Sequence, residues 1–525
     1  MREESIMPRT APGQTRTETT TCTCTADLTL PDYLPDIRRV LSVRVRVMPG
    51  GTFVDRGKAE FAGSCRFFVL YLDPEGRPAS ASLSGDYEWS VPTGAPDGAE
   101  ARAAGWCEAG AVACRPGGPR RLSCTAELVC RAMIFSPGEP GEEETETTQR
   151  HEKLKKQVTG RVAEPFFCEP IHLSENVRLN RPGEIRVLSA DGGIRVEEPE
   201  TAAGECRARG EVMLNVLCAD EDGDVFGVPV KMPFEGRLFD VREGATVRTV
   251  VRGDLTSCEA DVSEEEGGSS LTVSASVLLS GVGYEETTEE VTTDRFSTEY
   301  PSRVDYGTTE VWETPMTVTA AVTMSGSEPR EADENEGPCR VADTYVTAGP
   351  VSLSVEGNRL SAGVELRVGM LLRGAPDADG RTELSYFSFD SPQTIEVTLP
   401  SIAPEGATAT GTLSILSAKG RCEGERVSFE CEAALSAEID VLHTMRIARS
   451  ATDDTEHPYP QDEDCLTAAY LCDGDSLWSV AKRYHTSPER IAGTNALSGD
   501  ALRAPDSAYP LDGYIKLLIE QGKKD

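Results

Sequence analysis

The sequence predicts a mainly β protein of three tandem β-sandwich-like domains, followed by a small β-α-α-β module. Three observations support this fold class. Apolar and polar residues alternate in runs from residue 21 to about 445, a period-2 pattern that is typical of half-buried strands. The chain holds 48 glycines and 33 prolines, and many of them separate these runs at turn positions. After residue 465 the apolar spacing becomes helical.

The length of 525 residues is too great for one hydrophobic core. Changes in composition divide the chain into a leader, three β domains of which the third is divergent, a linker and a terminal module. The predicted divisions are a disordered leader at 1–20, β domains at 21–150, 151–300 and 301–445, an acidic linker at 446–465, and the module at 466–520.

The N-terminal residues 1–20 consist largely of Thr, Pro, Arg and Glu, a composition that predicts disorder. They lack the apolar segment of a secretory signal, so we expect no export and predict a cytoplasmic protein. No run of 18 apolar residues occurs in the chain, and a transmembrane segment is therefore not expected.

The formal net charge is −36, from 52 basic and 88 acidic side chains. Nucleic acids and anionic membranes attract Lys and Arg, so this charge argues against both as partners. The acidic runs are predicted to be solvated loops or linkers. They lie at 141–148, 263–268, 331–337 and 452–464.

Sixteen cysteines and five histidines show neither a C-x-x-C pair nor a shared cluster. We therefore predict no metal and no cofactor. In a chain without an export signal, the cysteines are expected to be buried free thiols. Oxidation after incorporation into an extracellular or dormant shell is the alternative.

The β region repeats itself about every 150 residues. Each copy opens with an aliphatic residue, then has a glycine before an apolar strand, then an aromatic residue in the next strand, and closes on a long alternating strand. The opening residues are Ile37, Ile185 and Val341, which are 148 and 156 residues apart. The closing strands are "RLSCTAELVC" (121–130), "SLTVSASVLLS" (270–280) and "RVSFECEAALS" (426–436). Such a unit can bury one face against a second sheet.

The C-terminal module begins with a short strand ending near Tyr470 and Leu471. Leu477, Val480, Ala481 and Tyr484 follow at the spacing of one helix face. Ser487 and Pro488 are expected to cap and begin a second helix whose Ile491 faces inward. The segment "YIKLLI" (514–519) is expected to form the closing strand.

Two resemblances follow from these motifs. "LPDYLPDIRRVLSV" (30–43) and "TTDRFSTEY" (292–300) resemble the SPOCS domain of spore coat morphogenetic proteins. "GDSLWSVAKRYHTSPERIAGTN" (474–495) resembles a LysM module. In that group SPOCS domains precede a C-terminal LysM module, as here, and the resemblance covers about residues 21–520.

The resemblance implies a non-enzymatic coat assembly scaffold in the mother cell, recruited to the forespore surface. Its LysM module would dock onto an ATPase of the coat basement layer, and other coat proteins and self-association would add contacts. The alternative is a module that binds peptidoglycan or other N-acetylglucosamine chains. In either case the implied groove residues are Asp473, Gly474, Asp475, Ser476, Leu477, Asn495, Ala496 and Leu497.

A structural interpretation of these residues stays open beside the functional one. Gly474 and Asp475 suit a turn and a helix cap, while Leu477, Trp478 and Tyr484 suit the core. The chain has no G-x-S-x-G, P-loop or H-E-x-x-H motif, and no catalytic residues are predicted.

Overall fold

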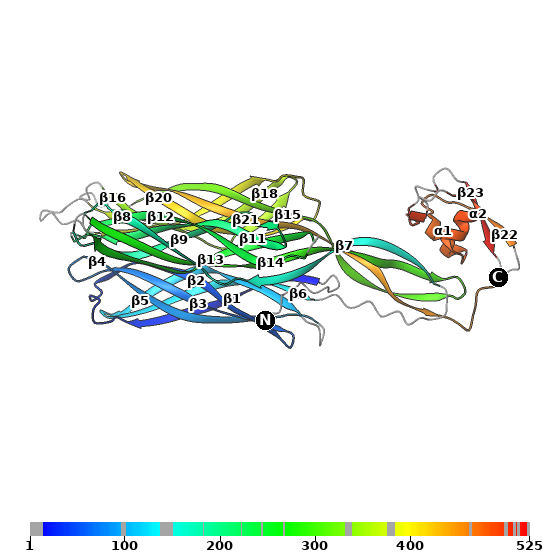
Figure 1. Cartoon of the computed structure of the whole chain (residues 1–525), viewed down its shortest axis with the longest axis horizontal. Coiled ribbons are helices and arrows are strands. Elements are labelled where there is room, and N and C mark those ends of the chain that lie inside the picture. The colour runs from blue at the N-terminus through cyan, green and yellow to red at the C-terminus, as the bar shows by residue number, and fades with distance from the viewer. Residues whose placement is uncertain are drawn as a thin grey trace.

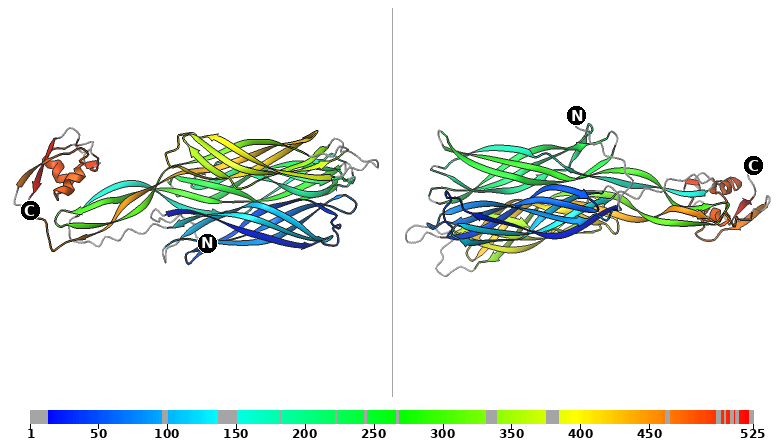
Figure 2. Two further views of the ribbon diagram at one scale, coloured as in Figure 1. Left: turned by 180° about the vertical axis from the view of Figure 1, so that it is seen from behind. Right: turned by 90° about the horizontal axis from the view of Figure 1, so that it is seen from below.

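The computed structural model shows a body of packed β-sheets, an arm that extends from it, and a small module beyond the arm (Figure 1). Figure 2 shows the same arrangement from behind and from below. The predicted mainly β fold is confirmed, with the two helices lying near the C-terminus. The structure describes residues 14–95, 101–136, 151–181, 183–221, 223–242, 245–265, 268–330, 339–374, 384–460, 465–497, 502–503, 505–507, 511 and 515–521.

The first unit consists of two three-stranded antiparallel sheets that share one hydrophobic core. One sheet has the order β1 (Gln14–Thr29), β6 (Arg121–Ser136), β5 (Arg102–Gly118), and the other has β2 (Arg39–Asp55), β3 (Lys58–Leu72), β4 (Pro78–Pro92). The prediction of a disordered leader is wrong from Gln14 onward. These threonine-rich residues form a strand because they pair in register with the end of β6. Residues 1–13 lie outside the described residues.

The second unit repeats this plan. One sheet has β14 (Gly268–Ser297) between β13 (Val247–Glu265) and the two segments β7 (His151–Phe167) and β8 (Ile171–Leu179). In the other sheet β11 (Glu205–Ala219) lies between β12 (Val225–Asp240) and the strands β9 (Arg186–Val196) and β10 (Glu200–Ala202).

The third unit has the same topology. One sheet has the order β15 (Ser302–Pro329), β21 (Arg426–Asp453), β20 (Thr408–Glu423). In the other, β18 (Arg359–Arg373) lies between β19 (Leu384–Thr398) and the strands β16 (Arg340–Ala348) and β17 (Ser352–Glu356). In all three units the first strand pairs with the last, and the last strand is central in its sheet. The likeness to SPOCS domains and the divisions drawn from the sequence stay predictions.

The glycine and the aromatic residue of the repeat lie opposite each other in the first two units. Gly63 pairs with Tyr87, and Gly210 pairs with Phe234. A Cβ at either glycine would come within 2.4 and 2.5 Å of the aromatic side chain. The two landmarks recur together because the ring occupies the space that the glycine leaves. In the third unit Gly363 faces Thr394, so this pairing is lost.

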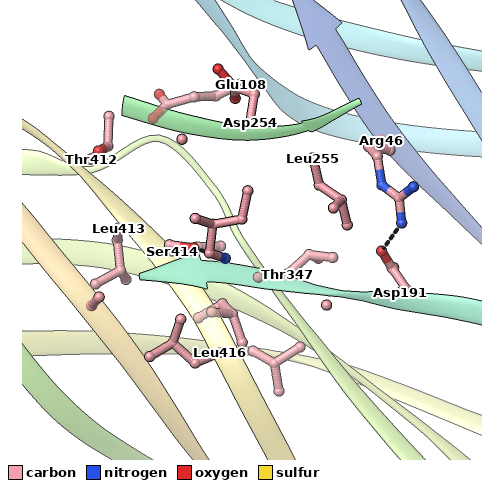
Figure 3. A pocket seen from close by; sticks show the side chains of 18 of the residues that line it. Arg46, Glu108, Asp191, Asp254, Leu255, Thr347, Thr412, Leu413, Ser414 and Leu416 are labelled. Carbon is pink, nitrogen blue, oxygen red and sulfur yellow. Dashed lines mark hydrogen bonds and ion pairs between the residues drawn. The ribbon is translucent and has the colours of Figure 1, made fainter. Parts of the chain in front are cut away.

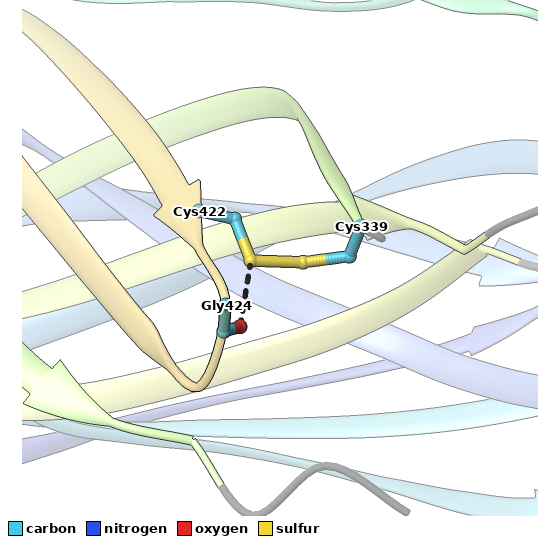
Figure 4. The surroundings of a disulfide bond; sticks show 3 residues. All are labelled: Cys339, Cys422 and Gly424. Atoms are coloured by element: carbon cyan, nitrogen blue, oxygen red, sulfur yellow. Dashed lines mark hydrogen bonds between the residues drawn. A yellow bond between two sulfur atoms is a disulfide. The ribbon is translucent and has the colours of Figure 1, made fainter. Parts of the chain in front are cut away.

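The prediction that the cysteines are free thiols is wrong for one pair, which forms a disulfide. Cys339, just before β16, is bonded to Cys422 at the end of β20 (Figure 4). The bond joins the two sheets of the third unit, since β16 and β20 belong to different sheets. The other fourteen cysteines are free, and most of them are buried.

The three units meet at a cluster of aliphatic residues. Leu70, Leu217 and Leu371 hold similar places near the ends of the central strands β3, β11 and β18, and each is at most 5% exposed. Leu72 and Ala219, at the ends of β3 and β11, belong to the cluster as well, together with leucines from neighbouring strands of the same sheets: Leu41, Leu188 and Leu384. We call these residues the leucine junction.

A polar layer also connects the units and lines a central cavity of about 350 Å³. Arg46 of the first unit donates to Asp191 of the second at 2.6 Å (Figure 3). Asn215 of the second unit donates to Asp343 of the third at 2.9 Å. Burial raises the pKa of Asp343, whereas Asp191 is held below its ordinary pKa, because Arg46 and Arg44 outweigh the effect of burial.

The arm consists of the outer ends of β7, β14, β15 and β21, two of which are 28 residues long and one 30 (Figure 1). His151 Nε2 and Ser302 Oγ contact the two carboxylate oxygens of Asp453 at 2.7 and 2.6 Å. The guanidinium of Arg446 lies 3.4 Å from the centre of the Tyr306 ring. The predicted linker at 446–465 is therefore wrong up to Asp453, because residues 446–453 pair with β15.

Candidate functional site

The C-terminal module has one hydrophobic core between a two-stranded sheet and two short helices. Its elements are β22 (Cys465–Tyr470), α1 (Leu477–Arg483), α2 (Pro488–Thr494) and β23 (Lys516–Gln521). Leu477, Val480 and Ala481 are at most 1% exposed and face this core, as predicted. Ile491 is also 1% exposed, so the inward face of the second helix is confirmed.

Both helices begin at serine caps. Ser476 accepts a hydrogen bond from the backbone N–H of Ser479, whose hydroxyl accepts one from Ser476 N–H in return. Ser487 accepts from Arg490 N–H, and Pro488 occupies the first turn. These bonds satisfy N–H groups that a helix start leaves without partners, and they confirm the predicted start of α2.

The loop before α1 contains five of the predicted groove residues. Asp473 and Gly474 are exposed, and Gly474 has a φ of 86°, which a turn with this geometry requires. Asp475 accepts from Cys472 N–H at 2.9 Å and pairs with Arg483. Ser476 is the cap, and Leu477 is 1% exposed. Only the first two residues therefore present free surface in this loop.

The loop after α2 contains the other three predicted residues. The Asn495 amide donates to Leu518 O at 2.7 Å and to Ile491 O at 2.8 Å, and its oxygen accepts from Leu518 N–H at 2.7 Å. It therefore ties α2 to β23. Ala496 is exposed with a φ of 51°, and Leu497 packs against the core. Leu477 and Leu497 belong to one cluster, so the two loops border the same hydrophobic core.

The structure assigns most polar atoms of the predicted residues to structural hydrogen bonds. Asp473, Gly474 and Ala496 are the exposed members of the set. They present one carboxylate and backbone groups rather than an exposed aromatic ring. Stacking on a sugar face, as Trp and Tyr provide elsewhere through their amphipathic rings, has no side chain among these three residues.

A contact with the arm uses α1 and was not predicted from the sequence. The indole N–H of Trp478 donates to Asp294 of β14 at 2.9 Å, and Lys482 Nζ lies 2.6 Å from the same carboxylate. Tyr306 Oη donates to its other oxygen at 2.7 Å. Burial alone would raise the pKa of Asp294, but the hydrogen bonds from Lys482, Trp478 and Tyr306 hold it below its ordinary value.

Apolar contacts support this polar contact. Phe296 of β14 meets Trp478 edge to face, with 5.0 Å between ring centres. Leu154 of β7 belongs to the same core cluster as the helices. Tyr459 stacks on His485 with 3.5 Å between ring centres. The module is thus fixed to the tip of the arm through one face of α1. Trp478 and Asp294 are 184 residues apart in the chain, so no local sequence pattern reveals their contact.

The outer face of the two-stranded sheet exposes three large apolar side chains. Leu466 and Tyr470 are 59% and 67% exposed, and Leu518 is 36% exposed. Leu518 lies opposite Ala468, between Leu466 and Tyr470 of β22, while the exposed charged residues Glu520 and Lys516 lie opposite Leu466 and Tyr470. We call Leu466, Tyr470 and Leu518 the apolar strip. The alternation of exposed and buried residues in "CLTAAY" was the available signal for it.

Two classes of feature are absent from the residues that the structure describes. They include no group of three or more His, Cys, Asp or Glu side chains placed to hold a metal ion. None of their helices has the length and apolarity needed to cross a membrane.

Comparison with known proteins identifies one domain of a known family. No curated protein matches the chain. The LysM domain family matches residues 473–504, which include both helices and both loops described above. The chain therefore carries a C-terminal LysM domain.

Proposed function

We propose that this chain is a non-enzymatic assembly scaffold in which three β units and an arm present a LysM domain to a protein partner. The observation that carries the proposal is the apolar strip. Three large apolar side chains lie exposed on one face of the LysM domain, beside Lys516 and Glu520, and exposed apolar clusters with polar surroundings are typical of protein interaction sites. The strip faces away from the buried residues Ala469, Leu517 and Ile519, so it is free while α1 contacts the arm.

The resemblance of the β units to SPOCS domains implies where the scaffold acts and what it binds. By this resemblance the partner is an ATPase of the coat basement layer, the location is the mother cell, and the scaffold is recruited to the forespore surface. Other coat proteins and further copies of the chain are additional partners. Tandem units on a shared surface raise the effective concentration of each contact.

Binding of purified basement-layer ATPase to the full chain tests this proposal. The variant Leu466→Ser/Tyr470→Ser removes two of the three side chains of the strip, and Asp473→Lys alters the loop before α1 without touching the strip. We expect the strip variant to lose binding by about 10-fold or more, because two anchor side chains are removed, and Asp473→Lys to bind normally. Equal binding by the strip variant and the unchanged chain would refute docking through the strip.

Glycan binding is the second candidate, and the LysM match at 473–504 favours it. LysM domains suggest recognition of peptidoglycan or related N-acetylglucosamine chains. The accessible loop residues Asp473, Gly474 and Ala496 would form the contact. Sedimentation of the full chain with purified peptidoglycan separates the candidates: saturable binding that Asp473→Lys abolishes and the strip variant retains would establish glycan recognition instead.

A further inference from the structure

A second cavity lies where the first unit meets the other two. Its volume is about 550 Å³, within the range of small-molecule sites. Strands of all three units contribute to its wall. Aromatic side chains make much of the lining: Phe61, Tyr87, Trp89, Trp106 and Phe166.

Three hydrogen-bond donors in this lining have no partner among the described residues. They are the indole N–H groups of Trp89 and Trp106 and Nη1 of Arg252, and all three atoms are buried. Arg252 contacts Asp254 through Nε at 2.9 Å, which leaves Nη1 available. Buried donors are rarely left unpaired in folded proteins. A ligand with acceptor oxygens would provide partners for them.

A pair of thiols forms part of the same wall. Cys107 lines the cavity and is 5% exposed. It lies directly opposite Cys130 on the neighbouring strand, and the two sulfur atoms are 3.2 Å apart. The sulfur of Cys22 lies 3.4 Å from Cys130 on the other side. Directly opposed residues of an antiparallel pair are close enough for a disulfide when their side chains approach.

The surroundings of Cys107 favour its thiolate. The hydrogen bond with Cys130 lowers the pKa of Cys107 against the effect of burial, and the Tyr87 hydroxyl and the Arg252 charge act in the same direction. Cys258 in the second unit is also 5% exposed, yet burial raises its pKa to about 11. The two thiols are equally buried, so their environments make the difference. The thiolate is the form that attacks a disulfide.

We propose that this cavity is a thiol-modification site, at which Cys107 exchanges with a low-molecular-weight disulfide and Cys130 resolves the product. The Cys107 sulfur attacks one sulfur of the small disulfide, whose S–S bond breaks, and the departing half takes up a proton as a free thiol. Cys130 then attacks the Cys107 sulfur, and the second half leaves as a thiol. In sum, two cysteine thiols are oxidised to one disulfide and one small disulfide is reduced to two thiols.

The test uses the full chain with Cys472→Ser, since Cys472 is an exposed free thiol that would react first. The probe is bis(2-hydroxyethyl) disulfide, which reacts with the folded chain under native conditions. The remaining thiols are then alkylated, and peptide mapping identifies the modified cysteines. We expect a Cys107–Cys130 disulfide to form at least 10-fold faster than Cys258 is modified. Equal rates at Cys107 and Cys258, or reaction of Cys107 only in denaturant, would overturn the proposal.

Two variants separate the steps. With Cys130→Ser we expect the reaction to stop at a mixed disulfide on Cys107, seen as a mass gain of one half of the probe. Cys114 also lies opposite another cysteine, Cys124, but it lines neither cavity. In Cys114→Ser the rate at which the Cys107–Cys130 disulfide forms should therefore be unchanged. The rate measured on the chain that retains both Cys107 and Cys130 does not depend on whether the variants fold. If Cys130 formed a disulfide with another cysteine equally fast in a chain that lacks Cys107, the proposal would also be contradicted.

Discussion

The units of the body and the LysM domain are both held by contacts between segments far apart in the chain, but the balance of chemistry differs. The units meet at the leucine junction, in which every unit contributes buried aliphatic side chains, and at the polar layer that includes Arg46 and Asp191. The LysM domain meets the arm at one carboxylate, Asp294, which receives hydrogen bonds from three side chains, with Phe296 and Leu154 packed beside it. A carboxylate contact responds to pH and salt. The comparison therefore predicts that the contact between the LysM domain and the arm is more sensitive to pH than the leucine junction.

The largest effect should come from the disulfide of the body. Cys339 and Cys422 are 83 residues apart, and in the chain-entropy view closing such a loop contributes about 4 kcal/mol. We expect reduction to lower the urea midpoint of the third unit while the LysM domain, whose Cys465 and Cys472 form no disulfide, keeps its stability. Hydrogen exchange with and without reductant measures both regions. Equal loss of protection in both would show that they unfold as one.

A smaller loss is expected at the leucine junction. Leu217 is 1% exposed and lies where the three units meet. Leu217→Ala should cost about 3 kcal/mol, through lost burial and the cavity that remains. Urea unfolding followed by circular dichroism gives the value, and Leu466→Ala at a 59% exposed site is the control. A change below that of the control would mean that the junction does not hold the units together.

Removing the arm carboxylate should release the LysM domain and leave the body intact. Asp294→Ala leaves the buried indole N–H of Trp478 without its partner, at a cost of about 2 kcal/mol. We expect faster cleavage between residues 454 and 465 in limited proteolysis, together with an unchanged melting temperature of the body. Asp261→Ala, which removes an exposed carboxylate on neighbouring β13, serves as the matched substitution. Unaltered proteolysis would refute the role of Asp294.

The smallest effect is the dependence of this contact on pH. The pKa of Asp294 is lower in the folded chain than in the unfolded one, so its contribution is complete above the ordinary carboxyl pKa of about 4 and disappears as the pH falls through the lowered value. Trp478 fluorescence should therefore change below about pH 4, the ordinary carboxyl value. In Asp294→Asn this transition should be absent. A transition of the same size in that variant would assign it to other carboxylates.

Local patterns predicted much of the secondary structure. The alternation in 121–130 and 270–280 marked parts of strands β6 and β14, and Ser487 followed by Pro488 marked the start of α2. The errors occurred where pairing overrode composition. The polar residues from Gln14 to Thr20 become a strand through their pairing with β6, and 446–453 do so through β15.

The candidate site was predicted in place but not in detail. The eight predicted residues lie before, at the start of and after the two helices, yet the Asn495 amide is used by Leu518 and Ile491, and Leu477 is buried. A motif indicates which residues form a loop. It does not show which of their atoms remain available after the loop has folded.

The sequence alone determined the β class, the repeated landmarks and the β-α-α-β order of the LysM domain, because these depend on residue types within a few positions of one another. Only the tertiary structure decided that three units share a leucine junction, that Trp478 meets Asp294, and that Cys107 faces Cys130 beside a cavity. Each of these depends on how strands and sheets pair and pack across long stretches of chain. Side-chain periodicity states which face of a strand is buried, but not what it will be buried against.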